Sequence, residues 1–324
     1  MQGIEIKGFG SCVPKHVVTN DDLGKIVETN DEWISSRTGI KARRISEGED
    51  TSVLATNAAK KAMEKAKISA EDIDLIIVAT VTPDYFCPSV SCMVQKEIGA
   101  KNAMAFDINA ACSGFVFALQ TAYSLLKAND NFNNALIIGA EDFSKLINWE
   151  DRSTCVLFGD GAGAAVISKS DNEKILRFYS KSEGEKGEAL EIGARDVKNA
   201  FTHKYSEKYP YIKMDGGAIF KFASLIIAEA INKLLEEEKL CIDDIDYIVP
   251  HQANARIIAY TAKKMHVSID KFYLNLDKYA NTSSASIPIA LSEMQDKNIL
   301  KKGMKIIMVG FGGGLTYGSA LIEL

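Results

Sequence analysis

The sequence predicts an α/β protein whose sheets are largely parallel. Three short runs at residues 75–80, 135–139 and 305–310 are rich in β-branched and aliphatic residues, as strands covered on both faces are. Between them lie helical stretches such as 53–66, where apolar residues recur at every fourth position. This alternation of strands with helices is typical of an α/β fold.

Length and composition describe an ordinary globular protein. The chain has 324 residues, of which 47% are hydrophobic and 25% are charged. This balance excludes a disordered chain, a collagen-like chain and a disulfide scaffold. The net charge of −5 argues against a dedicated nucleic-acid binder, which would carry a strong basic excess. A local basic patch remains compatible with it.

The cysteines and the N-terminus predict a cytoplasmic protein. No run approaches the roughly 18 apolar residues of a membrane span, and residues 1–7 lack the basic and apolar regions of a signal peptide. The six cysteines form no Cys-x-x-Cys pair, so we expect reduced thiols. They are Cys12, Cys87, Cys92, Cys112, Cys155 and Cys241.

An internal repeat joins two parts of the chain. Residues 71–76, Glu-Asp-Ile-Asp-Leu-Ile, recur as Asp-Asp-Ile-Asp-Tyr-Ile at 243–248, and each copy follows an Ala-rich helical stretch. A second pair, 163–167 and 318–322, shares the pattern Gly-x-Ala-x-Ile. Chance similarity between helix–turn–strand junctions is the alternative, but two pairs of similar segments in the same order favour a duplicated half of the chain.

Duplication predicts two halves, 1–170 and 171–324, that meet between residues 170 and 200. Residues 181–211 are polar with interspersed aromatic residues. We interpret this segment as an insertion or a long loop rather than as a linker between free domains.

Cys112 is the first candidate for a catalytic residue. It lies in Ala-Ala-Cys-Ser-Gly, where an apolar strand ends in small residues, and helical spacing begins at Val116. Free N–H groups and the dipole at a helix start stabilise a thiolate. Small neighbours permit the sharp turn of a nucleophile elbow. A structural cysteine packed in the core is the alternative.

Two more candidates follow strands in the second half. His251 ends the apolar run 247–249, and ligands of α/β sheets gather at the carboxyl ends of strands. Asn281 lies between a short strand at 272–275 and a helix that begins near Ser286, and its amide can donate to a developing oxyanion. A core histidine and a capping asparagine are the alternatives.

Glycine clusters at 158–163 and 310–315 close the two halves. Neither cluster matches a dinucleotide fingerprint or a P-loop, so phosphate cradling is poorly supported. Glycines here permit tight hairpins and a close approach of the backbone to a ligand. The N–H of Gly313 or a neighbour is a candidate oxyanion-hole donor.

Five motifs, taken together, resemble the β-ketoacyl-acyl-carrier-protein synthase III family, the initiating condensing enzymes of type II fatty acid synthesis. They are Asp-Glu-Trp-Ile-Ser-Ser-Arg-Thr-Gly-Ile at 31–40, Ala-Ala-Cys-Ser-Gly-Phe around Cys112, His-Gln-Ala-Asn from His251, Asn-Thr-Ser-Ser-Ala-Ser from Asn281 and Gly-Phe-Gly-Gly-Gly-Leu-Thr-Tyr-Gly at 310–318. The resemblance runs through essentially the whole chain. It implies the thiolase fold, a duplicated five-layered α-β-α-β-α arrangement with pseudo-twofold halves, and a homodimer.

The resemblance also implies the chemistry. The Cys112 thiolate attacks an acyl-CoA thioester, and malonyl-acyl-carrier protein then loses CO₂ to leave an enolate. His251 and Asn281 donate to the enolate oxygen, while the N–H groups of Cys112 and Gly313 hold the second oxyanion. Phe311 borders the malonyl site, unless its role is simple packing. No cofactor or metal is implied, because acyl-CoA is a substrate.

Further residues are assigned by the same resemblance. Trp33 and Arg152 sandwich the CoA adenine with Arg37 nearby, although Trp33 can equally be a buried anchor of its helix. The residues of the pantetheine channel are Met214, Gly216, Ile219, Phe220, Ala223 and Asn254.

A basic stripe is the candidate docking face for the carrier protein. Arg256, Lys263 and Lys264 share one face of the helix that follows His251, and Lys221 is a possible addition. A merely solvated face is the alternative.

Cys87 marks a departure from the family, which in many members has a Phe before Pro-Ser that reaches across the dimer and walls the acyl pocket. The smaller Cys87 predicts a deeper pocket and longer or more branched primers. Alternatively, Phe86 or Tyr85 fills the space.

Related reactions are distinguished by residue type. No cysteine follows Cys241, which argues against a degradative thiolase, and Asn281 stands where elongating enzymes have a second histidine. The remaining alternatives are a condensing enzyme of secondary metabolism, a cysteine hydrolase using Cys112, His251 and Asn281, and a silent acyl-CoA-binding protein. The presence of all three polar residues disfavours the last.

Overall fold

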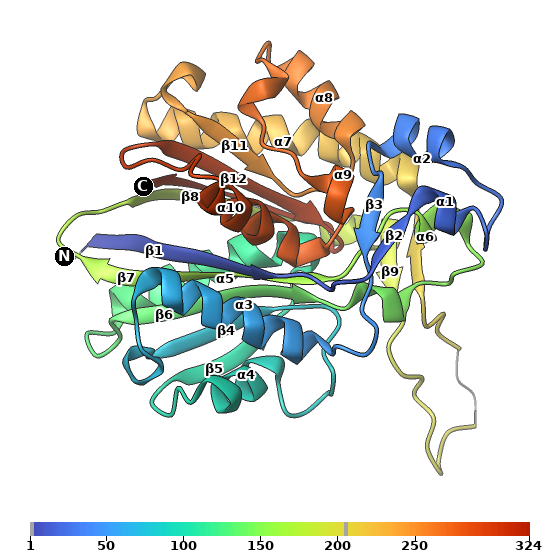
Figure 1. Ribbon diagram of the computed structural model, residues 1–324, viewed down its shortest axis with the longest axis horizontal. Coiled ribbons are helices and arrows are strands. Elements are labelled where there is room, and N and C mark those ends of the chain that lie inside the picture. The colour runs from blue at the N-terminus through green and yellow to red at the C-terminus, as the bar shows by residue number, and fades with distance from the viewer. Residues whose placement is uncertain (1–2, 204–206) are drawn as a thin grey trace.

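The computed structural model describes residues 3–203 and 207–324, and it contains two large sheets with helices on every face (Figure 1). The first sheet has the strand order β1 (Gly3–Cys12), β7 (Gly161–Ser170), β6 (Asn134–Glu141), β4 (Leu75–Ala79), β5 (Met104–Ile108). The second has the order β11 (Tyr247–Pro250), β12 (Lys305–Gly312), β13 (Thr316–Glu323), β8 (Ile175–Ser182). The strands predicted at 75–80, 135–139 and 305–310 are confirmed as β4, β6 and β12.

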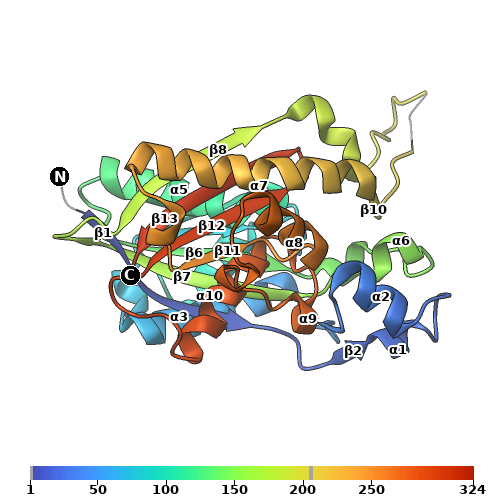
Figure 2. The same ribbon diagram turned by 90° about the horizontal axis from the view of Figure 1, so that it is seen from above.

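Helices form three layers, one between the two sheets and one on each outer face (Figure 1), and Figure 2 looks down on the layer that covers the second sheet. Between the sheets lie α5 (Gly114–Ala128) and α10 (Ser286–Asp296), which share one apolar core with both sheets. The outer face of the first sheet is covered by α3 (Thr51–Ala66) and α4 (Val90–Ile98). The outer face of the second is covered by α7 (Gly216–Glu238) and α8 (Ala255–Lys264). The predicted α/β class with five layers is therefore present.

The sheets are mixed, so the expectation of largely parallel sheets was wrong. Strand β4 runs parallel to β5 and β6, and β11 runs parallel to β12. The pairs β1–β7, β6–β7, β12–β13 and β8–β13 are antiparallel. The reason is clearest at β12 and β13, which are joined by residues 313–315. So short a connection cannot contain a parallel crossover.

Helix α3 illustrates how local sequence fixes an element. It begins after Asp50 and ends where Lys67 takes a left-handed conformation, so the predicted helix is confirmed with two more residues at its start. Leu54, Ala58 and Ala62 are fully buried against the first sheet. The small alanines let β1 approach closely, because a Cβ on Gly10 would lie 2.3 Å from the Ala62 nitrogen.

Smaller elements gather at one end of the molecule, beyond the carboxyl ends of β4, β6 and β11 (Figure 1). They are β2 (Val17–Thr19), β3 (Ala42–Arg44), β9 (Leu190–Ile192), β10 (Ile212–Met214), α1 (Asn20–Leu23), α2 (Asp31–Thr38), α6 (Arg152–Cys155) and α9 (Leu276–Tyr279). The 3-10 turns are η1 (Ala70–Asp72), η2 (Ala111–Ser113), η3 (Phe143–Leu146), η4 (Gly184–Ala189), η5 (Ile242–Asp244), η6 (Ile269–Lys271) and η7 (Ser283–Ala285).

The segment 181–211 is more structured than a plain loop. Its start completes β8, and η4 and β9 follow before an extended loop that begins at residue 193. Strand β9 pairs antiparallel with β10. Within residues 3–203 and 207–324, no helix is both long and apolar enough to span a membrane.

Gly163 tests the contact that holds α10 on the first sheet. An added Cβ would lie 2.6 Å from the Ile289 nitrogen and 2.7 Å from the Pro288 carbonyl carbon. We expect Gly163→Ala to lower the free energy of unfolding by about 1–3 kcal/mol, as overpacking does, in urea denaturation. Gly184→Ala is the matched control, since no described atom lies within 4 Å of its added Cβ. Equal unfolding free energies for the two variants would contradict this account.

Candidate active site

Cys112 lies in the turn between β5 and α5. Turn η2 contains it, and α5 begins two residues later at Gly114. Ala111 adopts φ 46°, a left-handed conformation that is uncommon without glycine. The strand-to-helix elbow predicted for Cys112 is therefore present, and the cysteine is buried at 6% exposure.

The end of β12 reaches Cys112 from the second sheet. A Cβ on Gly312 would lie 2.8 Å from the Cys112 Cβ and 2.9 Å from its nitrogen. Gly310 is equally close to the neighbouring Ser113, whose Cα would be 2.8 Å away. Only glycine allows this backbone contact, which brings Gly313, the candidate donor, next to the turn of the nucleophile.

His251 follows β11 and is held in one orientation. Its Nδ1 lies 2.8 Å from the Ser286 Oγ, and that oxygen accepts a hydrogen bond from the Gln252 N–H at 3.3 Å. The Ser286 hydroxyl is therefore assigned as the donor to Nδ1, which leaves the imidazole proton on Nε2. Burial lowers the pKa of His251 to about 3, so the ring is neutral and its Nε2–H is a donor.

Phe311 lies against His251. The two rings are 5.1 Å apart at 70°, an edge arrangement, and Phe311 is 1% exposed. The apolar ring contributes to the desolvation of the histidine.

Asn281 is fixed through its backbone to the first half. Its N–H donates to the Leu157 carbonyl at 2.9 Å, and its own carbonyl accepts from the Gly159 N–H at 3.0 Å. The side-chain Oδ1 accepts from the Ser283 N–H at 2.8 Å. With Oδ1 engaged, the Nδ2 group is the part of the amide left to donate.

These elements converge on Cys112. Turn η2 packs against β12 and against η7, the turn that follows Asn281. Burial raises the pKa of Cys112 to about 12, the Ser283 hydroxyl lowers it, and the charge of Glu141 raises it. Desolvation thus outweighs the stabilised thiolate expected at a helix start, and the resting residue is a thiol.

The residues expected at the CoA adenine lie together on α2 and α6. The guanidinium carbons of Arg37 and Arg152 are each 5.0 Å from the centre of the Trp33 ring. Arg152 also donates to the Glu28 carbonyl at 2.8 Å. In this arrangement Arg152 is too close to Trp33 for a purine to lie between them.

The expected pantetheine residues lie between β10, α7 and α8. Met214 ends β10 and Gly216 begins α7, where Ile219, Phe220 and Ala223 follow. Asn254 caps α8, and its Nδ2 donates to the Arg37 carbonyl at 3.1 Å, which connects this region to the adenine residues.

The remaining expected residues are on the surface. Lys221, Arg256, Lys263 and Lys264 are all exposed on the adjacent helices α7 and α8. Whereas Cys112 is buried, Cys87 is exposed as well. Its neighbour Phe86 is 78% exposed and lies 5.4 Å from the Arg195 guanidinium.

Sequence reasoning missed the residues that support the three candidates. Ser286 orients His251, yet the sequence analysis used it only as the start of a helix within a Ser-rich motif. Glu141, fully buried at the end of β6, was not singled out. Its place at the carboxyl end of an apolar strand was the signal available in the sequence.

Comparisons with known proteins show the family to which the chain is similar. The family described as 3-oxoacyl-[acyl-carrier-protein (ACP)] synthase III matches residues 106–184, and its C-terminal counterpart matches 235–324. The β-ketoacyl-[acyl-carrier-protein] synthase III of Clostridium botulinum strain Okra is 57% identical over 99% of both chains. That of Clostridium novyi strain NT is 54% identical over 100% of this chain and 99% of the relative. The crystal structure of 3-oxoacyl-[acyl-carrier-protein] synthase III from Aquifex aeolicus VF5 has TM-score 0.92 at 45% identity, covering 99% and 100% of the two chains.

The raised pKa of Cys112 predicts how the thiol reacts with pH. Below a pKa of about 12 the thiolate fraction grows tenfold per pH unit. Alkylation of Cys112 by iodoacetamide, followed by mass spectrometry of its peptide, should therefore accelerate about tenfold per unit from about pH 6 to about pH 9. The exposed Cys87 in the same samples controls for reagent loss. A plateau near neutral pH would mean that the helix start prevails over burial.

Proposed function

The chain belongs to the 3-oxoacyl-[acyl-carrier-protein] synthase III family, and we propose how its residues share that family's reaction. The reaction is the decarboxylating condensation of an acyl-CoA primer with malonyl-acyl-carrier protein, which initiates fatty acid synthesis. The observation that carries the proposal is the convergence of Cys112, the glycine end of β12 and two oriented donors, His251 and Asn281.

The first half-reaction forms an acyl-enzyme. The Cys112 sulfur attacks the thioester carbon of acyl-CoA, and the CoA sulfur leaves with the proton that Cys112 gives up. The oxyanion formed in this step is held by the N–H groups of Cys112 and Gly313. The close approach of Gly312 to Cys112 supports this pairing.

The second half-reaction forms the new carbon–carbon bond. Malonyl-acyl-carrier protein loses CO₂, and the negative oxygen of the enolate accepts from His251 Nε2–H and Asn281 Nδ2–H. Its carbon then attacks the acyl carbon on Cys112, the carbon–sulfur bond breaks, and the released Cys112 thiolate takes up a proton from water. Phe311, packed on the His251 ring, borders the malonyl group with an apolar surface.

The same geometry counts against a cysteine hydrolase. A hydrolase needs its histidine to take the cysteine proton, which works best with a pKa near neutral. The pKa of His251 is lowered to about 3 and its Nε2 carries the proton, so the ring serves as a donor and not as a base.

CoA binding is assigned to the residues around Trp33 and at the start of α7. The adenine stacks on Trp33 after Arg152 has moved aside, with Arg37 nearby. The channel residues described above then pass the pantetheine arm along the start of α7. The reaction uses acyl-CoA as substrate and requires neither cofactor nor metal. All six cysteines are free thiols, which supports work in the reducing cytoplasm.

Duplication and dimerisation complete the proposal. Strands β1, β7, β6 and β4 have the same relative directions as β8, β13, β12 and β11, which supports halves 1–170 and 171–324. Strand β5 is the edge strand of the first sheet beside β4, and its Met104 is exposed. Tyr85 and Phe86, on the loop that follows β4, are also exposed. An edge strand flanked by aromatic residues supports a second copy of this chain as its partner.

The half-reactions test the assigned donors. His251→Ala and Asn281→Ala should each reduce decarboxylation about 10²–10³-fold, the usual cost of one oxyanion donor. Transfer of the acyl group from acyl-CoA to Cys112, followed by protein mass, should fall much less. Cys112→Ala serves as the control that abolishes the adduct. Equal losses in both half-reactions would remove the proposed roles of His251 and Asn281.

Charge reversal tests the basic stripe. Lys263→Glu combined with Lys264→Glu should raise the KM for malonyl-acyl-carrier protein several-fold and leave acylation by acyl-CoA nearly unchanged. The effect should shrink as salt is added, because exposed charges are screened. Reversal of Lys301 and Lys302, an equally exposed lysine pair elsewhere, is the matched control. Similar kinetics for both double variants would make the stripe a solvated surface.

Primer choice tests Cys87. In the proposed dimer, Cys87 walls the partner's acyl pocket, and each extra CH₂ of primer that it admits gains up to about 0.8 kcal/mol. Cys87→Phe should therefore lose butyryl- and isobutyryl-CoA as primers while it keeps acetyl-CoA, in assays of product mass. The same substitution at the exposed Cys241 is the control. Identical primer profiles for wild type and Cys87→Phe would exclude Cys87 as the determinant.

A further inference from the structure

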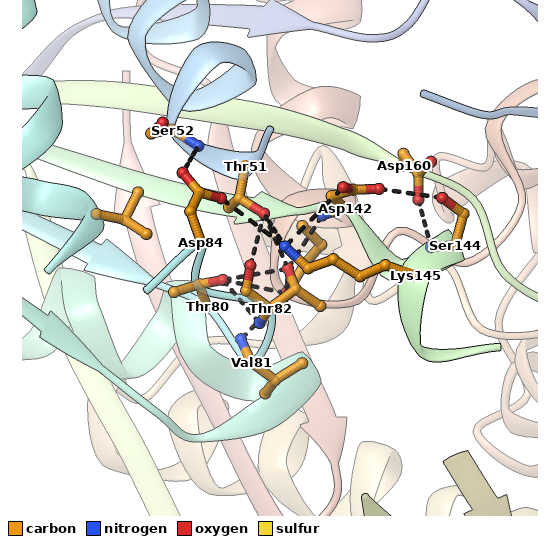
Figure 3. A network of polar contacts seen from close by, with 12 residues as sticks. Thr51, Ser52, Thr80, Val81, Thr82, Asp84, Asp142, Ser144, Lys145 and Asp160 are labelled. Carbon is orange, nitrogen blue, oxygen red and sulfur yellow. Dashed lines mark hydrogen bonds and ion pairs between the residues drawn. The ribbon is translucent and has the colours of Figure 1, made fainter. Parts of the chain in front are cut away.

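A polar network lies at the carboxyl ends of β4 and β6 (Figure 3), and Glu141, the last residue of β6, bonds to its members Val81 and Thr82. Glu141 is 0% exposed. Its Oε2 accepts from the Thr82 hydroxyl at 2.8 Å and from the Val81 N–H at 3.1 Å, while its Oε1 lies 2.8 Å from the Ser284 Oγ. Every hydrogen-bond partner of Glu141 among the described residues is uncharged, which is unusual for a buried carboxylate.

The hydrogens around Ser284 can be counted. Its Oγ lies 2.8 Å from the Glu141 Oε1 and also 2.8 Å from the Ala79 carbonyl oxygen. A serine hydroxyl has one hydrogen, so it can donate to only one of these two acceptors. Both contacts are attractive only if the Oε1 of Glu141 itself carries a hydrogen and donates to Ser284, which then donates to Ala79.

The second carboxyl oxygen of Glu141, Oε2, has the opposite pattern, because its neighbours donate hydrogens to it. The Thr82 Oγ1 accepts from the Asp142 N–H at 3.0 Å, so its hydrogen is directed to the Glu141 Oε2. The Thr51 Oγ1 is the nearest other side-chain oxygen that could accept the Thr82 hydrogen, but it lies 3.2 Å from the Thr82 Oγ1, whereas the Glu141 Oε2 lies at 2.8 Å. The Thr51 hydrogen itself goes to the Thr82 carbonyl at 2.6 Å. Oxygen Oε2 is thus a pure acceptor, and the proton belongs on Oε1.

We infer that Glu141 is a carboxylic acid in the folded enzyme and a positioning residue for its reaction. It ties the ends of β4 and β6 to Ser284, three residues beyond Asn281. The Ser284 peptide also lies against Gly139, where an added Cβ would be 2.3 Å from the Ser284 carbonyl oxygen. The segment that carries Asn281 is therefore anchored to the half that carries Cys112.

Electrostatics agrees with this protonation state. Burial raises the pKa of Glu141, and a charge on it would raise the pKa of Cys112 further. The neighbouring carboxylates share the one cation of the network, since Lys145 Nζ lies 3.8 Å from Asp84 and 3.9 Å from Asp142 (Figure 3). A neutral Glu141 therefore places no negative charge near Cys112 and does not raise the pKa of the thiol further.

The Glu141→Gln variant distinguishes a protonated Glu141 from an ionised one. Glutamine can donate from Nε2 to Ser284 and accept at Oε1 from Thr82 and Val81, as the protonated acid does. Asp160→Asn is the matched control, because both oxygens of Asp160 accept backbone N–H groups, from Ser46 and Ser144 at 2.8 Å each. An amide there must turn its NH₂ toward one of these donors.

Infrared spectra and thermal unfolding give direct readouts. At about pH 8, above the pKa of about 6 to which burial raises Asp142, the wild-type minus Glu141→Gln spectrum should contain a protonated carboxyl C=O band that shifts in D₂O. Glu141→Gln should unfold near the wild-type temperature, and Asp160→Asn several degrees lower. Absence of the band, or equal destabilisation of both variants, would overturn the inferred acid.

Activity tests the positioning role, which rests on the proposed function of Asn281. Glu141→Ala should slow decarboxylation at least tenfold, and Glu141→Gln should recover most of it. A Gln variant as slow as the Ala variant would overturn the positioning role. The infrared and thermal readouts do not depend on turnover, so they report on the acid even if the role proposed for Asn281 fails.

Discussion

The site depends on a contact between two backbone segments that leaves no room for a side chain. Strand β12 touches the turn of Cys112, and an added Cβ on Gly312 would lie 2.8 Å from the Cys112 Cβ. The Ser284 carbonyl comes closer still to Gly139 on β6, where an added Cβ would lie 2.3 Å from its oxygen. Because the nucleophile comes from one half of the chain and His251 and Asn281 from the other, this seam fixes their relative positions. Glycine at the seam is a steric requirement of the site.

Burial at the seam also sets the charges. Cys112 is held as a thiol, and the low pKa of His251 keeps its ring neutral. Neutral groups that present N–H dipoles toward a cavity cost less to bury than ions do. They also gain most when negative charge develops on a substrate oxygen in the same low-dielectric site. A resting site without charge is therefore suited to a reaction whose intermediates are anions.

The sequence was sufficient for the residues that lie where strands end. Cys112 and His251 were found because apolar strands end a few residues before them, a pattern local to the chain. Glu141 shows the same pattern but was passed over, because its contact with Ser284, 143 positions away, is not visible in the sequence. Ser286 could not be found in this way, since its importance lies in a contact with His251, 35 positions away. The antiparallel pairs of the two sheets were also missed, because strand composition alone does not distinguish a hairpin return from a crossover.

The residues expected at the CoA adenine differ from this buried site, because one of them has to move before adenine can bind. Arg152 lies 5.0 Å from the Trp33 ring centre, whereas a purine stacked between the two planes needs about 7 Å, or two contacts of about 3.5 Å. Adenine binding there requires Arg152 to leave the indole and its bond to the Glu28 carbonyl. That rearrangement falls on an exposed side chain at low cost. The proposed oxyanion donors are held by backbone and buried hydroxyl groups, so we expect them to stay in place when CoA arrives or departs.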